Sequence, residues 1–507
     1  MAAPAKIMTA ISLSEPVPSG KVLIIGSGIG GLSTAIILAG LGFDVTVLEK
    51  NRRPGGLLRS YTRDGIECEV GVHYLGSLDR GQILRRFFDY LGVTDKIPVT
   101  RMGEDGIIDR YLFEPGTHQP AIFDLPPGMD RFEEQLRVTF PGEQKQIDEI
   151  IKPIYKAADQ LHALDFLDID GNDFSLLDQC RSLGGILDDL QVSPRLRSVL
   201  AIASSWIGVP LGDCPAFYHN MALASYVSSS WRLGCSGSTM ADVLAERLRE
   251  LGGKIRTWAQ VERIMVQSKV VTGLQLSSGE ELAGGTVIGA VHPKVVLDML
   301  PQKGAVRPSY RQRISGIKDT HGIFSVHARI DADAHPELPY NIFKIDTDRR
   351  GNVPDLRYYQ IRKCERKGTN LLSILTSGRD ELWKPWAETG TGHRGQEYAN
   401  AKMDLAGQLI REAEDLLSPF KGLEILDTYT PLTLRDWVNT PGGSAYGVQR
   451  STSQMLATAL LNRTPVKGLY LAGQNVMAPG IIGTIMGSFS TVQLLLGPDE
   501  FKVNIRV

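Results

Sequence analysis

The sequence is poor in cysteine, in net charge and in long hydrophobic runs, and each shortage excludes a class of protein. Five cysteines are scattered over 507 residues without a CxxC pair, which argues against a disulfide framework and a dithiol redox centre. The formal net charge of -2 provides no basic field, so we expect no nucleic-acid partner. No apolar run reaches the roughly eighteen residues that a membrane-crossing helix needs. We therefore expect a cytoplasmic protein, with contact at a membrane surface left open.

Recognisable catalytic side-chain motifs are also missing. The sequence shows no Ser–His–Asp motif and no cluster with metal-ligand spacing, so covalent and metal mechanisms have no support and no metal is expected. Residues 1–20 lack an apolar segment of signal-peptide length, and we predict that they form a flexible tail. The remaining length is too great for one simple core, which favours two domains.

Glycine, in contrast, is plentiful at one joint near the start of the chain. The apolar run Val22–Ile25 predicts a buried parallel strand, and a GxGxxG motif follows it at once. Residues 29–41 are small or aliphatic and predict a helix that packs against a sheet. A second strand, Asp44–Leu48, ends at the acidic residue Glu49. This order of strand, glycine turn, helix, strand and acid predicts a dinucleotide-binding unit.

The spacing of the glycines has a physical reason. Gly26 permits a tight turn, Gly28 lets the backbone approach a pyrophosphate, and Gly31 lets helix and strand pack closely. The N-terminus of the helix offers free N–H groups and a partial positive charge to the phosphates. Glu49 can accept hydrogen bonds from ribose hydroxyls.

The following residues favour FAD over NAD. A second glycine pair, Gly55-Gly56, comes soon after Glu49. A cofactor that lies extended across the domain would need such a second joint, whereas NAD would not. The alternative is a turn followed by an ordinary β-hairpin around Asp64-Gly65.

Two segments carry a resemblance to a known family. The segments Lys21–Lys50 and Arg52–Gly76 together resemble the amine-oxidase/phytoene-desaturase superfamily of flavoproteins. Within it, EVGVHYLG (Glu69–Gly76) and AGQNVMAPGIIGTIMGS (Ala472–Ser488) resemble the branch of retinol saturases and carotenoid isomerases. Amine oxidases more often have Gly-Glu where this sequence has Gly473-Gln474. Asn475 departs from the aspartate that the resemblance leads us to expect.

The resemblance implies an α/β fold: a Rossmann-like FAD-binding domain built from discontinuous segments, with an inserted α+β substrate domain. The FAD-binding segments are 21–80, 234–293 and 461–507, and the substrate domain is 81–233 and 294–460. Val261 is implied to contact the adenine end through its backbone, although a core valine is the alternative. The residues that we predict to bind FAD are Gly26, Ser27, Gly28, Gly30, Gly31, Glu49, Lys50, Gly55, Gly56, Leu57, Leu58, Arg59, Val72, His73, Val261, Gly473, Gln474, Ile482 and Gly483.

The C-terminal segment completes the predicted flavin site. Gly468–Ala472 is predicted as the last parallel strand, and Gly473 as a tight turn beneath the flavin. A helix beginning near Ile482-Gly483 would aim its N-terminus at the pyrimidine edge of the flavin, where a reduced flavin carries negative charge. The alternative is a plain buried strand–helix unit.

The substrate side is predicted to be apolar. Helical patterns dominate Asp130–Leu190, while Leu371–Ser377 predicts a strand. Val199–Tyr226 is unusually apolar and predicts either a pair of core helices or the wall of a hydrophobic tunnel. Within this segment, Trp206, Gly208 and Pro210, followed by His219, resemble an aromatic–glycine–proline element of the saturase-like branch.

His73 and Tyr446 are the candidate catalytic residues. The strand that matches His73 in the resembled family runs beside the flavin, but a structural histidine is the alternative. Tyr446 belongs to Tyr429–Gly447, where aromatic residues flank Gly442-Gly443. That segment predicts a loop that closes over a flat substrate, or an ordinary surface loop.

Three functions are compatible with these patterns. The first is an FAD-dependent desaturase, saturase or cis–trans isomerase of carotenoid- or retinoid-like lipids; the second is an amine or amino-acid oxidase. The third is a flavin-binding partner protein without catalysis. No second GxGxxG occurs in a strand–helix context, so electrons would be exchanged with a quinone, oxygen, a protein or a diffusing reductant.

A lipid substrate suggests a membrane surface as a further partner. Ile83–Val93 predicts an amphipathic helix with Ile83, Leu84, Phe87 and Leu91 on one side. Two arginines, at positions 85 and 86, would lie near headgroup height if that side entered a bilayer. A core helix with two surface arginines is the alternative.

Overall fold

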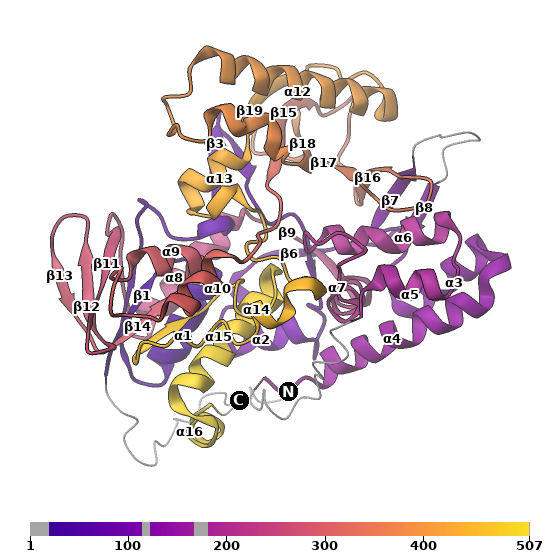
Figure 1. Ribbon diagram of the computed structural model, residues 1–507. Coiled ribbons are helices and arrows are strands. Elements are labelled where there is room, and N and C mark those ends of the chain that lie inside the picture. The colour runs from indigo at the N-terminus through magenta and orange to yellow at the C-terminus, as the bar shows by residue number, and fades with distance from the viewer. Residues whose placement is uncertain (1–19, 114–121, 167–180, 506–507) are drawn as a thin grey trace, which may run out of the picture.

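The computed structural model describes residues 20–113, 122–166 and 181–505. The predicted tail, apart from Gly20, lies outside the described residues, as does Cys180. Within the described ranges the chain forms two large sheets with helices around them, and the predicted α/β fold class is confirmed (Figure 1).

A parallel five-stranded sheet is built from three separate parts of the chain. The strand order is β10-β2-β1-β14-β20, so the order reverses between β1 and β14. In such sheets a ligand binds outside the carboxyl ends of the strands at this switch point. The strands are short, and all except the edge strand β10 are mostly buried, as expected for parallel strands covered on both faces. The strands are β1 (Lys21–Ile25), β2 (Asp44–Leu48), β10 (Lys254–Arg256), β14 (Thr286–Gly289) and β20 (Leu469–Leu471).

Helices with small residues cover this sheet. Helix α1 (Ile29–Gly40) is buried over ten of its twelve residues, because it packs between the sheet and helix α15 (Gly480–Leu496). Helix α8 (Gly237–Glu250) also contacts α1. The predicted meander of residues 261–290 is the antiparallel sheet β11 (Val261–Gln267), β12 (Val270–Leu276) and β13 (Glu281–Ala283), followed by β14.

A mixed seven-stranded sheet forms the other half of the molecule. Its order is β19-β15-β18-β17-β16-β7-β8, and the β16–β7 pair is the parallel one. Helix α12 (Gly395–Leu417) covers one face (Figure 1), while alternate residues of the central strands point to the other face, toward the parallel sheet. The strands are β7 (Asp109–Phe113), β8 (Ile122–Leu125), β15 (Ile323–Asp331), β16 (Asn341–Asp346), β17 (Asp355–Lys363), β18 (Thr369–Ser377) and β19 (Glu424–Tyr429).

A group of helices lies beside both sheets. The predicted pair in Val199–Tyr226 is formed by α6 (Pro194–Ser205) and α7 (Ala216–Ser228), joined by an irregular turn. Part of Asp130–Leu190 lies outside the described residues, and the described part is helical as predicted. The other helices are α2 (Ile83–Leu91), α3 (Met129–Thr139), α4 (Gln144–Ala163), α5 (Leu183–Asp189), α9 (Pro293–Met299), α10 (Pro308–Ser315), α11 (Asp380–Trp383), α13 (Pro431–Val438), α14 (Met455–Thr458) and α16 (Pro498–Asn504).

The suggested membrane contact of helix α2 is wrong. Ile83, Leu84, Phe87 and Leu91 are at most 1% exposed, because this apolar side packs into the main core, where Phe87 stacks against Phe489. A core-facing side and a lipid-facing side have the same pattern in a sequence. Among the described residues no single helix is long and apolar enough to cross a membrane; the sharply bent pair α15–α16 meets that test by length and composition.

Two small sheets join the halves. The hairpin predicted around Asp64-Gly65 is β3 (Ser60–Arg63) with β4 (Ile66–Glu69). A second sheet has the order β5-β9-β6, formed by Leu75–Gly76, Ser230–Leu233 and Val99–Arg101. It spans the proposed domain boundary after residue 80, and the division into two domains stays a prediction.

Candidate functional site

A cavity of about 1480 Å³ lies between the carboxyl edge of the parallel sheet and the seven-stranded sheet. Pockets for drug-sized ligands are roughly 300–1000 Å³, so this cavity has room for a dinucleotide and a second molecule. Of the residues predicted to bind FAD, those that line it are Gly26, Ser27, Gly28, Gly30, Glu49, Lys50, Gly55, Gly56, Leu57, Leu58, Val72, His73, Val261, Gly473 and Gln474. The lining does not include Gly31, Arg59, Ile482 or Gly483.

A glycine cradle forms one end of the cavity. Gly26 turns with φ of +96° directly after β1, and α1 begins at Ile29 without a side-chain cap on Gly28. Its first N–H groups are therefore open toward the cavity. A Cβ on Gly31 would lie 2.0 Å from the carbonyl oxygen of Gly26. Gly31 thus contributes by letting the helix pack against the turn, not by lining the site.

Glu49 ends β2 beside this cradle and is 6% exposed. Its carboxylate accepts hydrogen bonds from the Ser27 hydroxyl (2.5 Å) and from the Asn51 backbone N–H (2.8 Å). These bonds hold the carboxylate at the position where a ribose would be bound. Burial also lowers the pKa of the neighbouring Lys50 and of Arg59, with Glu49 opposing the shift in both.

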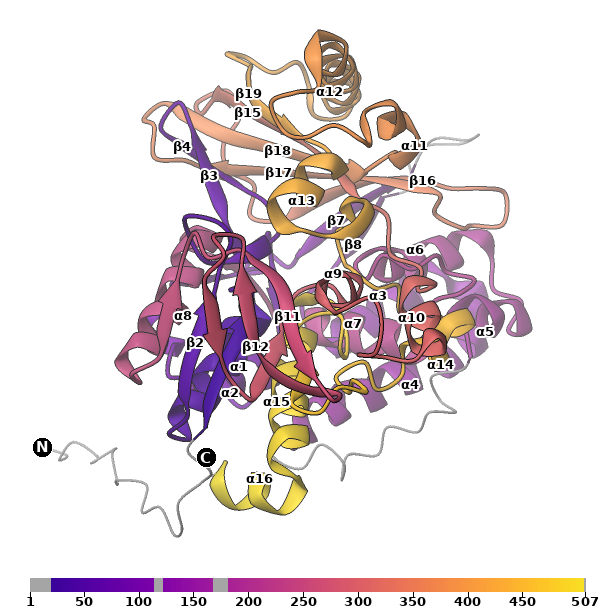
Figure 2. The ribbon, with the colours of Figure 1, turned by 60° about the vertical axis from the view of Figure 1, so that its left-hand side comes forward.

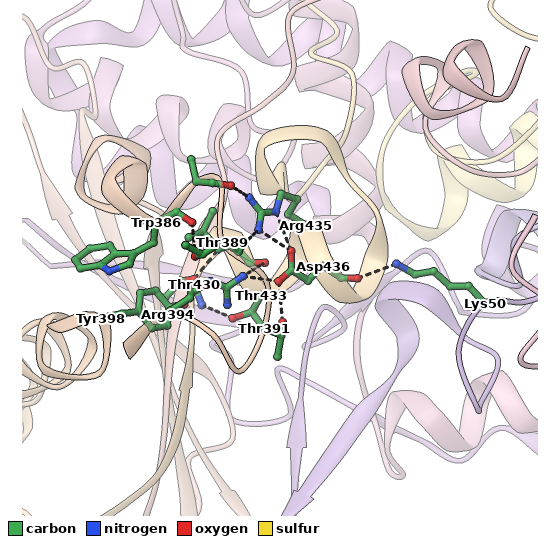
Figure 3. A network of polar contacts seen from close by, with 12 residues as sticks. Lys50, Trp386, Thr389, Thr391, Arg394, Tyr398, Thr430, Thr433, Arg435 and Asp436 are labelled. Atoms are coloured by element: carbon green, nitrogen blue, oxygen red, sulfur yellow. Dashed lines mark hydrogen bonds and ion pairs between the residues drawn. The ribbon is translucent and has the colours of Figure 1, made fainter. Parts of the chain in front are cut away.

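Helix α13 closes over the same end of the cavity. The Lys50 ammonium donates to the backbone oxygen of Asp436 (2.7 Å), and Arg59 donates to the backbone oxygen of Trp437 (2.9 Å). Figure 3 shows that the Asp436 carboxylate also accepts from Thr391 and Arg394. This network fixes α13, which carries Trp437, against the cavity rim. Residues 437–440 and 445–446 line the cavity, whereas residues 441–444 between them do not.

The two glycine-rich ends of the chain meet beneath the middle of the cavity. A Cβ on Gly30 would lie 2.4 Å from the Cα of Gly473, and the Ser488 hydroxyl donates to the carbonyl oxygen of Gly30 (3.0 Å). The approach requires glycine at position 30, while Gly473 turns with φ of +94°, a conformation that favours glycine. The N-terminal and C-terminal segments therefore form one continuous floor.

Helix α15 begins at Gly480, earlier than the predicted Ile482-Gly483, and its N-cap makes no side-chain hydrogen bond. Gly480, Ile481 and Thr484 line the cavity, whereas a Cβ on Gly483 would meet the carbonyl oxygen of Ala478 at 2.5 Å. The helix start thus presents N–H groups to the cavity, while Gly483 serves the packing of the preceding turn. Sequence reasoning missed the three lining residues.

His73 lies in the wall of the same cavity. Both ring nitrogens are buried without a hydrogen-bond partner, and its ring is 5.4 Å from that of Tyr358. Burial, reinforced by His327 and Arg362, lowers the pKa of His73 to about 3. The ring is therefore neutral at physiological pH, with one donor and one acceptor available to a bound molecule. By contrast, His219 is satisfied by Asn220 and the Leu200 oxygen and is structural.

An aromatic wall faces His73. Gly208 has φ of +68°, and a Cβ there would lie 2.7 Å from the ring of Tyr446. Burial raises the pKa of Tyr446 to about 12, so its hydroxyl is protonated. Sequence reasoning found Trp206, Gly208, Pro210 and Tyr446 but missed the other members. The missed residues of this wall are Tyr74, Ile323, Phe343, Tyr358 and Leu375.

A buried polar cluster lies directly behind the aromatic wall. The Asp109 carboxylate accepts from the Tyr226 hydroxyl (2.9 Å) and the Asn341 amide (2.8 Å). Its other oxygen has no hydrogen-bond partner. Burial raises the pKa of Asp109 to about 7, and the bonds from Asn341 and Tyr226 oppose the shift. This cluster supports the ring of Tyr358, whose hydroxyl donates to Asn341 (3.1 Å).

The carboxylates that line the cavity, other than Glu49, are engaged with neighbours or exposed. Asp188 pairs with Arg197 (2.6 Å), and Asp355 accepts from Ser377 (3.0 Å). Asp380 and Glu381 are exposed. In the described part of the chain, no group of three His, Cys, Asp or Glu side chains has metal-binding geometry. None of the residues named for the aromatic wall itself carries a carboxylate that could anchor an ammonium group.

These features fit a flavin dinucleotide. The glycine cradle at α1 suits a pyrophosphate, the Glu49 end suits a ribose, and the open N-terminus of α15 suits a ring system that becomes negative on reduction. When bound, a flavin would supply hydride exchange with a carbon atom. The residues that line the cavity would bind it, exclude water and hold a second molecule beside the aromatic wall.

Comparisons with known proteins agree with this geometry. The family model described as flavin containing amine oxidoreductase matches residues 29–489. The chain is 24% identical to all-trans-retinol 13,14-reductase of Danio rerio, over 97% of this chain and 88% of that protein. It is 25% identical to the chloroplastic prolycopene isomerase of Arabidopsis thaliana, over 93% and 78%. An oxidoreductase structure from Methanosarcina mazei has a TM-score of 0.64 at 15% identity, covering 93% of this chain and all of that one.

The family match spans nearly the whole described chain, from the start of α1 onward, and includes Glu49, Gly55-Gly56, the aromatic wall and the start of α15. The chain therefore belongs to the flavin-containing amine oxidoreductase family and is a flavin-dependent oxidoreductase.

Proposed function

We propose that the protein uses FAD to act on the carbon–carbon bonds of an apolar polyene or isoprenoid lipid, as a desaturase, saturase or cis–trans isomerase. The aromatic wall, which lines the same cavity as the start of α15, carries this proposal. A hydrocarbon chain offers nothing to hydrogen-bond, so its site needs shape and exclusion of water more than charged groups. Similarity over nearly the full chain to a retinol reductase and a carotenoid isomerase supports the same substrate class.

The dinucleotide is proposed to be FAD because the glycine cradle has two parts, one at Gly28 and one at Gly56. Gly28 and Gly56 face one another, so that a Cβ on Gly56 would lie 3.0 Å from the Cα of Gly28. The cavity continues from there past Gly473 to the aromatic wall. Such length suits an adenine dinucleotide that extends across the domain.

An amine oxidase is the second candidate, and the two candidates differ in which substrates should change the flavin absorbance. Purified holoenzyme kept without oxygen is expected to lose its flavin absorbance with a polyene of retinoid or carotenoid type, or, when first reduced, to be reoxidised by one. Amines are expected to leave the spectrum unchanged, because the aromatic wall has no free carboxylate. Bleaching by amines alone would refute the proposal. A spectrum that responds to neither class would favour a non-catalytic flavin protein.

His73 is proposed to contact the flavin or the substrate directly. The change His73→Phe keeps an aromatic ring in the wall but removes both unpaired nitrogens. Turnover of a polyene is expected to fall by about tenfold or more, as for a lost hydrogen bond to the reacting system. Flavin content is the control and is expected to stay unchanged, because the cradle is untouched. Unchanged turnover would make His73 a wall residue only.

The electron partner is proposed to be a quinone, oxygen, a protein partner or a freely diffusing reductant. A net isomerisation would need none.

A further inference from the structure

Two exposed leucines mark a surface that the active site does not use. Leu456 and Leu460 are 80% and 68% exposed. Leu460 also has φ of +52°, a left-handed conformation that asparagine tolerates and a bulky apolar residue rarely adopts. This leucine gains no burial in exchange for the backbone strain. Its side chain is therefore suited to a partner outside the described chain.

The chain around these leucines carries only basic charge. The sequence contains no Asp or Glu from Trp437 to Pro498, or from Leu300 to Lys318. The two stretches touch, because the Arg313 guanidinium donates to the carbonyl oxygen of Ala457 (2.8 Å). Figure 2 shows the helices of the two stretches, α10 and α14, side by side. The exposed basic residues of the two stretches are Lys303, Arg307, Lys318, Arg463 and Lys467.

The acidic residues next to these stretches do little to cancel this charge. Asp319 accepts from Lys294 (2.7 Å) and from His292 (2.9 Å). Asp213 accepts from the backbone and the hydroxyl of Ser453 (2.9 and 2.5 Å). Asp298 on α9 is exposed and lies at the edge of this region. The balance of free charge is positive.

The leucines lie close to a mouth of the cavity. Pro210 and Gly212 line the cavity and are themselves exposed, so the cavity reaches the surface there. The next residue, Asp213, is bonded to Thr452 and Ser453. Ser453, in turn, is only three positions before Leu456 in the chain. If these leucines contacted a surface, a molecule moving from that surface into the cavity would have only a short path to travel.

We propose that Leu456, Leu460 and the five exposed basic residues form a docking surface for an anionic lipid membrane. The leucines would enter the acyl region, and the basic side chains would lie among the headgroups, which is the arrangement of interfacial segments on anionic bilayers. The proposal rests on the proposed function, because a lipid substrate is what makes a mouth at a membrane useful. It replaces helix α2, whose apolar side is buried.

The test is flotation of the holoenzyme with vesicles. Binding is expected with mixed phosphatidylcholine and phosphatidylserine, weaker binding with phosphatidylcholine alone, and release at high salt. The double change Leu456→Ser with Leu460→Asn is expected to reduce binding by about tenfold or more, since both apolar anchors are lost. The double change Arg307→Glu with Lys318→Glu is expected to reduce it by at least roughly 25-fold, from about fivefold for each basic residue.

Matched controls separate docking from folding. Val138→Ser with Met403→Ser removes two exposed apolar side chains elsewhere and is expected to leave binding unchanged. Leu460→Asn alone is expected to keep or raise the unfolding midpoint, because asparagine tolerates the backbone conformation. Lower vesicle binding by a variant of undiminished stability would support docking.

Several outcomes would overturn the proposal. Holoenzyme that does not float with either vesicle would do so, as would equal binding by the leucine double variant, or capture by an immobilised acidic peptide instead of vesicles. Turnover of a polyene in detergent micelles is a separate readout, and the surface variants are expected to keep it. If the protein floats as expected but converts no polyene in detergent, the proposed function fails and the docking surface stands.

Discussion

The change Gly30→Ala is expected to give a folded protein that has lost most of its flavin. A Cβ at this position would lie 2.4 Å from the Cα and 3.0 Å from the backbone nitrogen of Gly473. Neither contact can be relieved by turning a side chain, so α1 and the turn after β20 must move apart. Both carry N–H groups that face the cavity. An overpacking cost of about 1–3 kcal/mol at this joint would weaken flavin binding by roughly 5- to 150-fold.

The same helix supplies the control. A Cβ on Gly40 would meet no atom within 4 Å, so Gly40→Ala is expected to keep its flavin and to gain up to about 1 kcal/mol from helix propensity. The measurements are the ratio of flavin to protein absorbance after gel filtration and the affinity of the apoprotein for FAD. If the two variants retain flavin equally well, the floor formed by Gly30 and Gly473 is not needed for binding.

The nucleotide end of the site could be predicted from sequence because its signals are local. The turn at Gly26, the helix after it and the acid at Glu49 follow one another within one strand–helix–strand unit, and the geometry of each is set by its neighbours. The contact between Gly30 and Gly473 joins residues far apart in the chain. The sequence predicts a strand followed by a glycine turn in each segment, but it does not predict the contact itself.

The aromatic wall could not be predicted in the same way. Tyr358 and Tyr359 are adjacent in β17, and one faces the cavity while the other packs under α12. Which of the two faces the site depends on the register with β16 and β18, which a single strand does not determine. The strand DLRYYQIRK shows no regular alternation of apolar and polar residues that would indicate which side faces the cavity.

Amphipathic patterns were similarly ambiguous. Helix α2 has a strongly one-sided apolar face, and the sequence alone does not reveal whether protein or lipid covers it. The position of α13 over the nucleotide end was also beyond sequence reasoning. Lys50 and Asp436 are 386 positions apart. Lys50 binds a backbone oxygen, which every residue has, so the residue type at position 436 does not indicate this contact.

Asp109 provides the last prediction, which concerns stability and pH. This carboxyl is fully buried at the start of β7, behind Tyr358 and beside the cavity wall. Burial raises its pKa to about 7, from an ordinary value near 3.8. The folded protein therefore holds a proton on Asp109 more tightly than the unfolded chain does. Between about pH 4 and pH 7, unfolding releases that proton, so a rise in pH favours the unfolded state.

The change Asp109→Asn is expected to remove this pH dependence. Asparagine can keep the acceptor for Tyr226 and Asn341 and never ionises, so the variant should gain about 2–3 kcal/mol relative to wild type between pH 5 and pH 8. Urea unfolding at both pH values measures the difference. Tyr226→Phe is the control: it removes one hydrogen bond but keeps the buried carboxyl, and so should keep the wild-type slope. Parallel pH profiles for wild type and Asp109→Asn would mean that this carboxyl is already ionised in the folded protein, compensated by the nearby Arg232.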